Sequence, residues 1–216
     1  LRSATEISTS ISQLFASKFN DDKKTLAFSD NVQDAAHRAG FFNARTWRFG
    51  FRSALQRYVE NGGAGKSLAD FTKGFIDYWH DQMDDESFVS FFIAPNMTWM
   101  RAYEEMIQNR KLGKDALAKK LMSDIEKRIS YEIMLEYGLT SRIGRTLEKS
   151  GCSCLSFKEE ELLEVAGNVH ERVTNEIGSL PNTSAKRYEQ MVAGYVNILR
   201  QNGAFDDDAF YLFLKE

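Results

Sequence analysis

Residues 43–59 read NARTWRFGFRSALQRYV and carry the clearest helical pattern of the chain. Apolar side chains recur there at intervals of three and four residues, which places them on one face of an α-helix. These side chains are Trp47, Phe51, Ala54, Leu55 and Tyr58. Arg45, Arg48 and Arg52 follow the same spacing on another face. The pattern therefore predicts an amphipathic helix with a buried apolar face and a positively charged face.

Helical patterns continue on both sides of this segment. We expect a helix after Ser67 and others at about residues 4–19, 32–39, 97–111, 114–137, 159–177, 184–201 and 209–215. Gly40 is expected to end the helix at 32–39, because glycine often follows the last helical residue. Apolar residues step by four from Leu117 to Ile133, which predicts one long helix. Residues 88–93 fit either a strand or a buried helix.

One short apolar strand is expected at residues 25–28, which read Thr-Leu-Ala-Phe. Glycines at 138, 144 and 151 interrupt the pattern and indicate an irregular segment over 139–157. The predicted fold class is therefore mainly α, a multi-helix domain with one or a few short strands.

The composition is that of a folded globular protein. The 216 residues include 28 basic and 31 acidic side chains, and the formal net charge of −3 excludes a bulk polycation. No signal peptide opens the chain, and the longest apolar run, 88–94, is too short to cross a membrane, so we expect no membrane partner. Two cysteines, Cys152 and Cys154, cannot build a disulfide framework, which favours a reducing, cytoplasmic location.

The three arginines at 45, 48 and 52, called the arginine ridge below, have two interpretations. Guanidinium groups make forked hydrogen bonds to phosphates, so a ridge of them could follow a nucleic-acid strand. Phe49 lies near the ridge and could stack on a base. The alternative is a solvated arginine face that pairs with acidic residues from elsewhere in the chain.

Other motifs do not indicate catalysis. Residues 62–67 read GGAGKS, but Glu60 occupies the first glycine position of a phosphate-binding loop, so we interpret the segment as a loop with a helix cap at Ser67. Asp77, His80, Asp81 and Asp84 share a helical face, and we favour a charged surface there over a metal site. Cys152 and Cys154 have no second pair, which argues against structural zinc. We identify no catalytic, cofactor-binding or metal-binding residue.

Residues 26–35 read LAFSDNVQDA. This stretch resembles the L-x-F-[ST]-D-[SN]-x-Q-D-A signature of large bacterial superfamily 2 helicases, the DEAD/DEAH-box-like enzymes. The resemblance is closest over residues 8–58 and looser over 137–151 and 191–205. In that family the signature opens the second RecA-like motor lobe.

The resemblance implies a division of the chain and a role for its first part. Residues 1–60 would begin the second motor lobe, and residues 61–216 would form a helical insertion domain. It also implies that Ser29, Asp30 and Gln33 lie near the nucleic-acid track, with Arg38 following. The extension of that track along the arginine ridge is our own inference.

The expected function is that of a piece of an ATP-dependent helicase, a helical domain that guides or separates nucleic-acid strands. Its partners would be nucleic acid, with DNA as the expected form, and the remaining lobes of the same longer chain. The resemblance places ATP and Mg²⁺ in the full-length protein, so no cofactor and no ATPase activity are expected for these residues alone. The alternative is a non-enzymatic helical protein-interaction module, which the acidic balance and the aromatic-rich helices favour.

Overall fold

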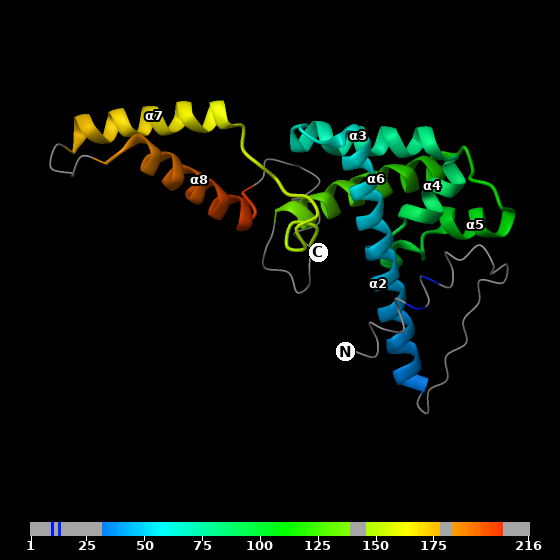
Figure 1. Cartoon of the computed structure of the whole chain (residues 1–216). Helices are drawn as coiled ribbons and strands as arrows, with labels where there is room; N and C mark the ends of the chain where they lie inside the picture. The colour runs from blue at the N-terminus through cyan, green and yellow to red at the C-terminus, as the bar shows by residue number, and fades with distance from the viewer. Residues whose placement is uncertain (1–9, 11–12, 14–31, 139–145, 178–182, 205–216) are drawn as a thin grey trace. The chain divides into compact units, whose positions relative to one another are not determined.

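The computed structural model describes residues 10, 13, 32–138, 146–177 and 183–204, without the side chains of 32–39, 41 and 42. The elements are α2 (Val32–Tyr58), η1 (Val59–Gly63), α3 (Leu68–Gln82), α4 (Asp85–Phe92), η2 (Pro95–Met97), α5 (Arg101–Asn109), α6 (Ala116–Tyr137), α7 (Glu159–Glu176) and α8 (Ala185–Gln201). The chain is thus mainly α-helical, as expected (Figure 1), and these described segments contain no strand. The strand expected at 25–28 and the terminal helix expected at 209–215 lie outside the described residues.

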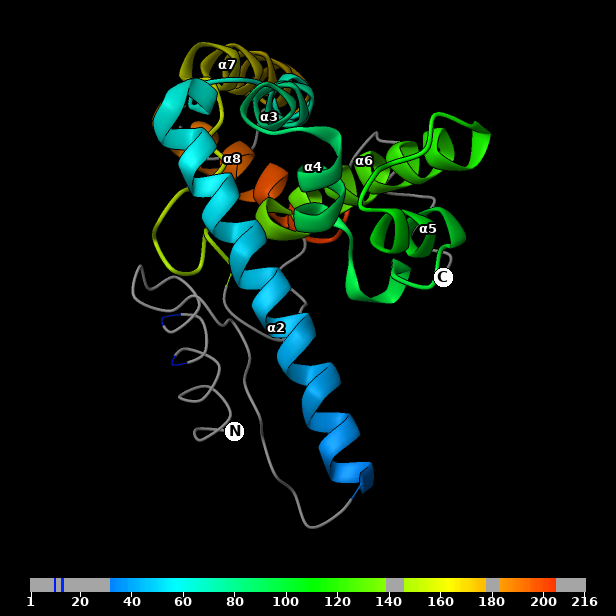
Figure 2. The same ribbon diagram turned by 90° about the vertical axis from the view of Figure 1, so that its right-hand side faces the viewer.

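The helix α2 is continuous where the sequence predicted a break. It runs from Val32 to Tyr58 through Gly40, so the prediction that Gly40 ends a helix was wrong. A glycine inside a helix costs only about 1 kcal/mol relative to alanine, which the good helix formers on both sides can offset. Figure 2 shows the resulting long rod, whose second half lies beside α3 and α4.

The chain divides into two compact units, residues 1–129 and 130–216, and the division falls within α6. The domain boundary expected after residue 60 falls inside the first unit. There Tyr58 of α2 packs edge-on against Phe71 and Phe75 of α3, with ring centroids 5.0 and 5.8 Å apart. These contacts bind α2 and α3 into one core.

The first unit is built around a cluster of aromatic rings. Four phenylalanines are at most 1% exposed: Phe51, Phe75, Phe88 and Phe92. The ring centroid of Phe92 lies 6.3 Å from that of Phe51, 5.6 Å from that of Phe75 and 4.8 Å from that of Phe88. Each fully buried phenylalanine contributes roughly 1.5–3 kcal/mol through removal from water. The cluster therefore fixes α2, α3 and α4 against one another.

The turn between α2 and α3 depends on glycine. Gly62 has a φ of 106°, a left-handed conformation that side chains with a Cβ rarely adopt. Gly74 of α3 faces the Tyr58 hydroxyl so closely that a Cβ would overlap with it. A Cβ at Gly63 would likewise overlap with the Tyr58 ring, so glycine at 63 and 74 leaves room for Tyr58 between the turn and α3.

Residues 88–93, which the sequence left open between strand and helix, lie mainly in α4. The carboxylate of Asp84 accepts a hydrogen bond from the backbone N–H of Ser87 at 2.7 Å and so caps this helix. Pro95 then starts the short helix η2, and for this reason α5 begins at Arg101 and not near residue 97.

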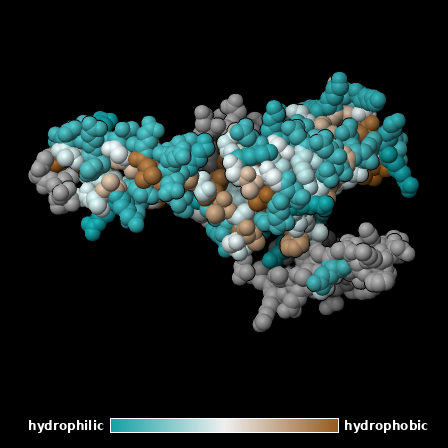
Figure 3. All heavy atoms as spheres, turned by 45° about the horizontal axis from the view of Figure 1, so that its top comes forward, coloured by the Kyte–Doolittle hydropathy of each residue, from teal (hydrophilic) through white to brown (hydrophobic). Residues whose placement is uncertain are grey.

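In the second unit, α7 and α8 form a helical hairpin. Ala166, Tyr188 and Val192 are its buried core, and Leu162, Val169, Val173 and Val196 pack around them. Figure 3 shows that the visible surface of this hairpin is mostly hydrophilic, with small separate apolar areas.

A buried arginine joins α8 to the end of α6. Arg200 is 8% exposed, and its guanidinium donates to both carboxylate oxygens of Glu148 at 2.9 and 3.0 Å. It also donates to the backbone carbonyl of Tyr137 and to the side chain of Asn197. This network fixes three separate parts of the second unit.

Candidate nucleic-acid interface

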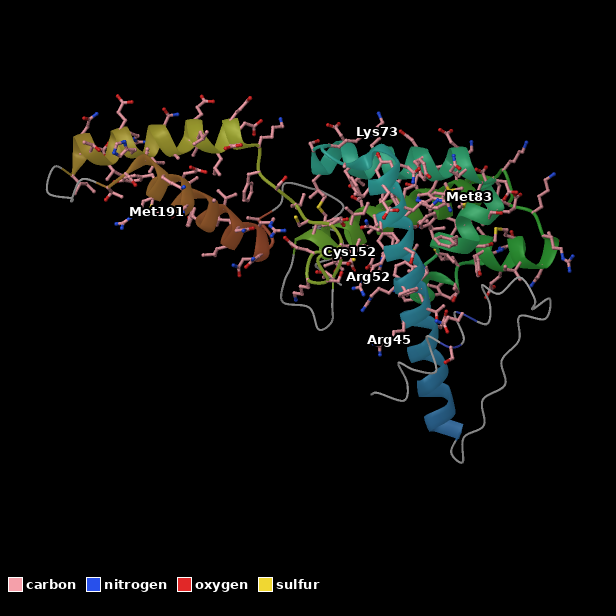
Figure 4. The ribbon with its side chains drawn as sticks, viewed as in Figure 1. Arg45, Arg52, Lys73, Met83, Cys152 and Met191 are labelled. Carbon is pink, nitrogen blue, oxygen red and sulfur yellow. The ribbon has the colours of Figure 1, made fainter. Side chains whose placement is uncertain are left out.

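The arginine ridge lies on one face of α2. Arg45, Arg48 and Arg52 are all partly exposed, whereas Phe51 and Leu55 on the adjoining face are 1% and 0% exposed. Figure 4 shows Arg45 and Arg52 leaving the same side of α2. The helical period predicted from the sequence therefore places the three arginines together, as expected.

Phe49 is presented beside the ridge. It follows Arg45 by four residues and precedes Arg52 by three, so one turn of helix separates it from each. Phe49 is 64% exposed, so its ring is accessible to a ligand. An exposed ring next to guanidinium groups is the combination that binds unpaired bases.

The remaining predicted residues are placed less completely. Gln33 and Arg38 lie in α2, but their side chains are outside the described atoms, and Ser29 and Asp30 lie outside the described residues. Arg38 precedes Arg45 by seven residues, close to two full turns. Its position in the helix therefore continues the line of Arg45 and Arg52.

Arg57, the last arginine of α2, has a different environment. Its guanidinium carbon lies 5.7 Å from the centroid of the Trp79 ring, within the range of a cation–π contact. Trp79 also stacks on Phe91, with ring centroids 6.1 Å apart. Arg57 thus covers the edge of the aromatic core.

The glycine-rich loop has the structure expected of a loop with a helix cap. The Ser67 hydroxyl accepts a hydrogen bond from the N–H of Asp70 at 3.2 Å and caps α3. The ammonium of Lys66 donates to the Tyr58 hydroxyl at 2.9 Å and lies 5.3 Å from the centroid of the same ring. Lys66 therefore supports the turn, and the predicted loop with a helix cap at Ser67 is confirmed.

The carboxylates and histidine at 77–84 do not gather into one cluster. The ring of His80 stacks on that of Phe88, with 3.9 Å between the ring centroids. Its Nδ1 lies 3.8 Å from the carboxylate of Asp85, and its Nε2 lies 3.5 Å from the carboxylate of Glu126. Asp84 instead caps α4, and its hydrogen bonds with Ser87 lower the pKa of its carboxyl group. Within the described ranges, no group of three or more His, Cys, Asp and Glu side chains is arranged to hold a metal ion.

Two features of the structure were not identified from the sequence: an exposed tryptophan and a buried arginine with its ion-pair partner. Trp99 is 74% exposed, yet its indole N–H donates to the carbonyl of Asn96 at 2.8 Å, which fixes the ring in place. The buried Arg200 pairs with the partly exposed Glu148, 52 positions away in sequence, so no local pattern could have found this pair.

Comparison of the chain with protein-family models, with curated proteins and with solved structures found no match. Among the helices that the structure describes, none has both the length and the apolar character needed to cross a membrane.

Proposed function

We propose that the arginine ridge of α2 binds nucleic acid, and that the chain is part of an ATP-dependent helicase in which it guides or separates strands. The observation that carries the proposal is the arrangement of three arginines on one helical face beside a phenylalanine that is 64% exposed. Residues 35–59 contain five arginines and neither lysine nor an acidic residue, although the whole chain has a net charge of −3. The helix α2 thus has a net positive charge in a chain that is acidic as a whole.

The dimensions of the ridge suit a short stretch of strand. Arg45 and Arg52 are seven residues apart in sequence, or about 10 Å along a helix that rises about 1.5 Å per residue. A strand of duplex advances about 3.4 Å per nucleotide, so the ridge would cover about three phosphates. Each guanidinium would bind phosphate oxygens through its N–H groups, and Phe49 would stack on a base where the strand is unpaired.

The setting of this surface follows from the resemblance of residues 26–35. The lobes that bind ATP and Mg²⁺ would belong to the full-length protein, and DNA bound in the cytoplasm is the proposed substrate. The residues of this chain would bind and orient strands, and they would not take part in ATP hydrolysis.

The test is salt-dependent binding of labelled single-stranded and duplex DNA, followed by fluorescence anisotropy. The triple variant R45A/R48A/R52A should bind more weakly, and the slope of log affinity against log salt should fall in magnitude by about 2–3. F49A should weaken binding to single strands by about tenfold or more, with little change for duplex.

A second triple variant, R101A/R110A/R172A, removes the same charge from α5, from the residue that follows α5 and from α7, and is the matched control. It should retain the affinity of the wild type. If both triple variants bind equally well or equally poorly, the ridge is not the binding surface.

An exposed apolar face on α8 favours the alternative, a helical protein-interaction module. Met191, Tyr195 and Ile198 are 54%, 62% and 57% exposed and share one face through their i, i+4, i+7 spacing. Such a face is suited to a groove on another protein. A stoichiometric protein partner that I198E loses, together with no measurable DNA binding, would favour this function over the first.

A further inference from the structure

The two cysteines follow a turn whose backbone is held by hydrogen bonds. The N–H of Ser150 donates to the carbonyl of Thr146 at 2.9 Å, and the N–H of Cys152 donates to the carbonyl of Leu147 at 3.0 Å. The Ser150 hydroxyl also lies 3.4 Å from the sulfur of Cys152. The first cysteine is therefore anchored at both its backbone and its side chain.

The residue between the two cysteines is anchored as well. The hydroxyl of Ser153 lies 2.9 Å from that of Tyr137, which is 4% exposed, so Ser153 faces the interior. Cys152 and Cys154 are both exposed and both free thiols, whereas Ser153 is only partly exposed. Ser153 thus points inward between two exposed thiols. Figure 4 marks Cys152 on this segment.

We propose that Cys152 and Cys154 bind one Cu(I) ion per chain in a two-coordinate dithiolate site. Thiolate is a soft ligand that favours Cu(I), Zn²⁺ and iron–sulfur clusters. A zinc site needs four ligands as a rule, and the described part of the chain brings no group of three candidate ligands together. The Cα atoms of residues i and i+2 are at most about 7 Å apart in any conformation, a separation that two cysteine side chains can bridge through one ion.

The binding step releases protons and transfers no electron. Each thiol loses its proton as its sulfur donates an electron pair to the metal, so two protons leave for each Cu(I) bound.

The experiment is an anaerobic titration of the reduced, full 216-residue chain with Cu(I) in competition with the coloured chelator bicinchoninate. The wild type should withdraw one equivalent of Cu(I). C152S and C154S should each lose at least a hundredfold in affinity, because one of two ligands is gone. S153A keeps both thiols but loses the contact with Tyr137, so its affinity should fall by a smaller factor.

S156A, an exposed serine close to the pair, is the matched control and should bind as the wild type does. Circular dichroism of each variant checks that the helices are retained. The proposal is overturned if either cysteine variant binds Cu(I) as tightly as the wild type. It is equally overturned by a stoichiometry of half an ion per chain with a dimer in sedimentation, which would mean that two chains share the metal.

Discussion

Replacement of Arg200 by methionine should selectively destabilise the second unit. Methionine can occupy the space of the aliphatic stem but has no N–H donors. The variant R200M therefore leaves the carboxylate of Glu148 and the carbonyl of Tyr137 without the guanidinium that each now contacts. Removal of one partner from such a pair is costly because the other is left in a partly dry environment.

The size of the effect follows from the exposure of the two partners. Breaking a fully buried ion pair costs about 3–5 kcal/mol. The side chain of Glu148 is 25% exposed, so water can solvate part of the remaining carboxylate, while that of Arg200 is 9% exposed. We therefore expect a loss of about 3 kcal/mol, near the lower end of that range. A loss of this size corresponds to roughly a hundredfold faster exchange of the amide hydrogens that become accessible only when α8 opens.

Native-state hydrogen exchange with mass spectrometry measures this directly on peptides from α8 and from the end of α6. The matched control is R172M, which removes an arginine 3.6 Å from Glu176 in a pair whose side chains are 79% and 66% exposed. Such a surface pair contributes at most about 0.5 kcal/mol. The double variant R200M/E148L should recover part of the loss, because it leaves no unpaired charge. If the α8 peptides of R200M and R172M exchange their amide hydrogens at the same rate, the network around Arg200 does not stabilise the second unit.

Three further changes test other contacts of the fold. G74A should destabilise the chain in urea unfolding by about 1–3 kcal/mol, because its Cβ would overlap with the phenol that ends α2. By contrast, G194A has open space in mid-helix and should stabilise by roughly 0.5–1 kcal/mol. S67A should cost about 1 kcal/mol through loss of the α3 cap, whereas S184A, whose side chain makes no capping bond, should cost a few tenths. The hydrogen bonds of Asp84 with Ser87 lower the folded-state pKa of its carboxyl group below the ordinary value of 3.8. The ionised carboxylate therefore stabilises the fold fully above pH 3.8, and this stabilisation is lost as the pH falls through the folded-state pKa. D84N should lack this step in urea midpoints measured from pH 6 to pH 2, and an identical acid profile for both proteins would contradict the assignment.

Helices with a regular apolar period were predictable from the sequence. The four-residue steps placed α6 correctly, and Leu121, Ile125, Ile129 and Ile133 are at most 1% exposed. Leu117, the first member of that series, is 43% exposed, because a period gives the face of a helix but not how far the neighbouring core extends. Gly40 shows the opposite difficulty, since a local stop signal is outweighed by the residues around it.

The candidate interface was predictable in its arrangement but not in its exposure. The spacing of the arginines fixes them on one face, while the 64% exposure of Phe49 depends on which helices pack nearby. The Arg200–Glu148 pair depends on chain segments brought together by folding, which no spacing rule describes. Local patterns therefore give the ridge, and tertiary packing gives the contacts that stabilise the units.

The tethered, solvent-facing indole of Trp99 has an optical consequence. All three tryptophans, at 47, 79 and 99, precede residue 130, so indole fluorescence reports on the first unit alone. Trp99, at 74% exposed, should emit at long wavelength and be quenched by iodide, while Trp79, at 8%, is shielded. The second unit contains no tryptophan and therefore does not contribute to indole emission. Indole emission and helical ellipticity, recorded on one sample, can therefore separate the melting of the two halves without any added dye.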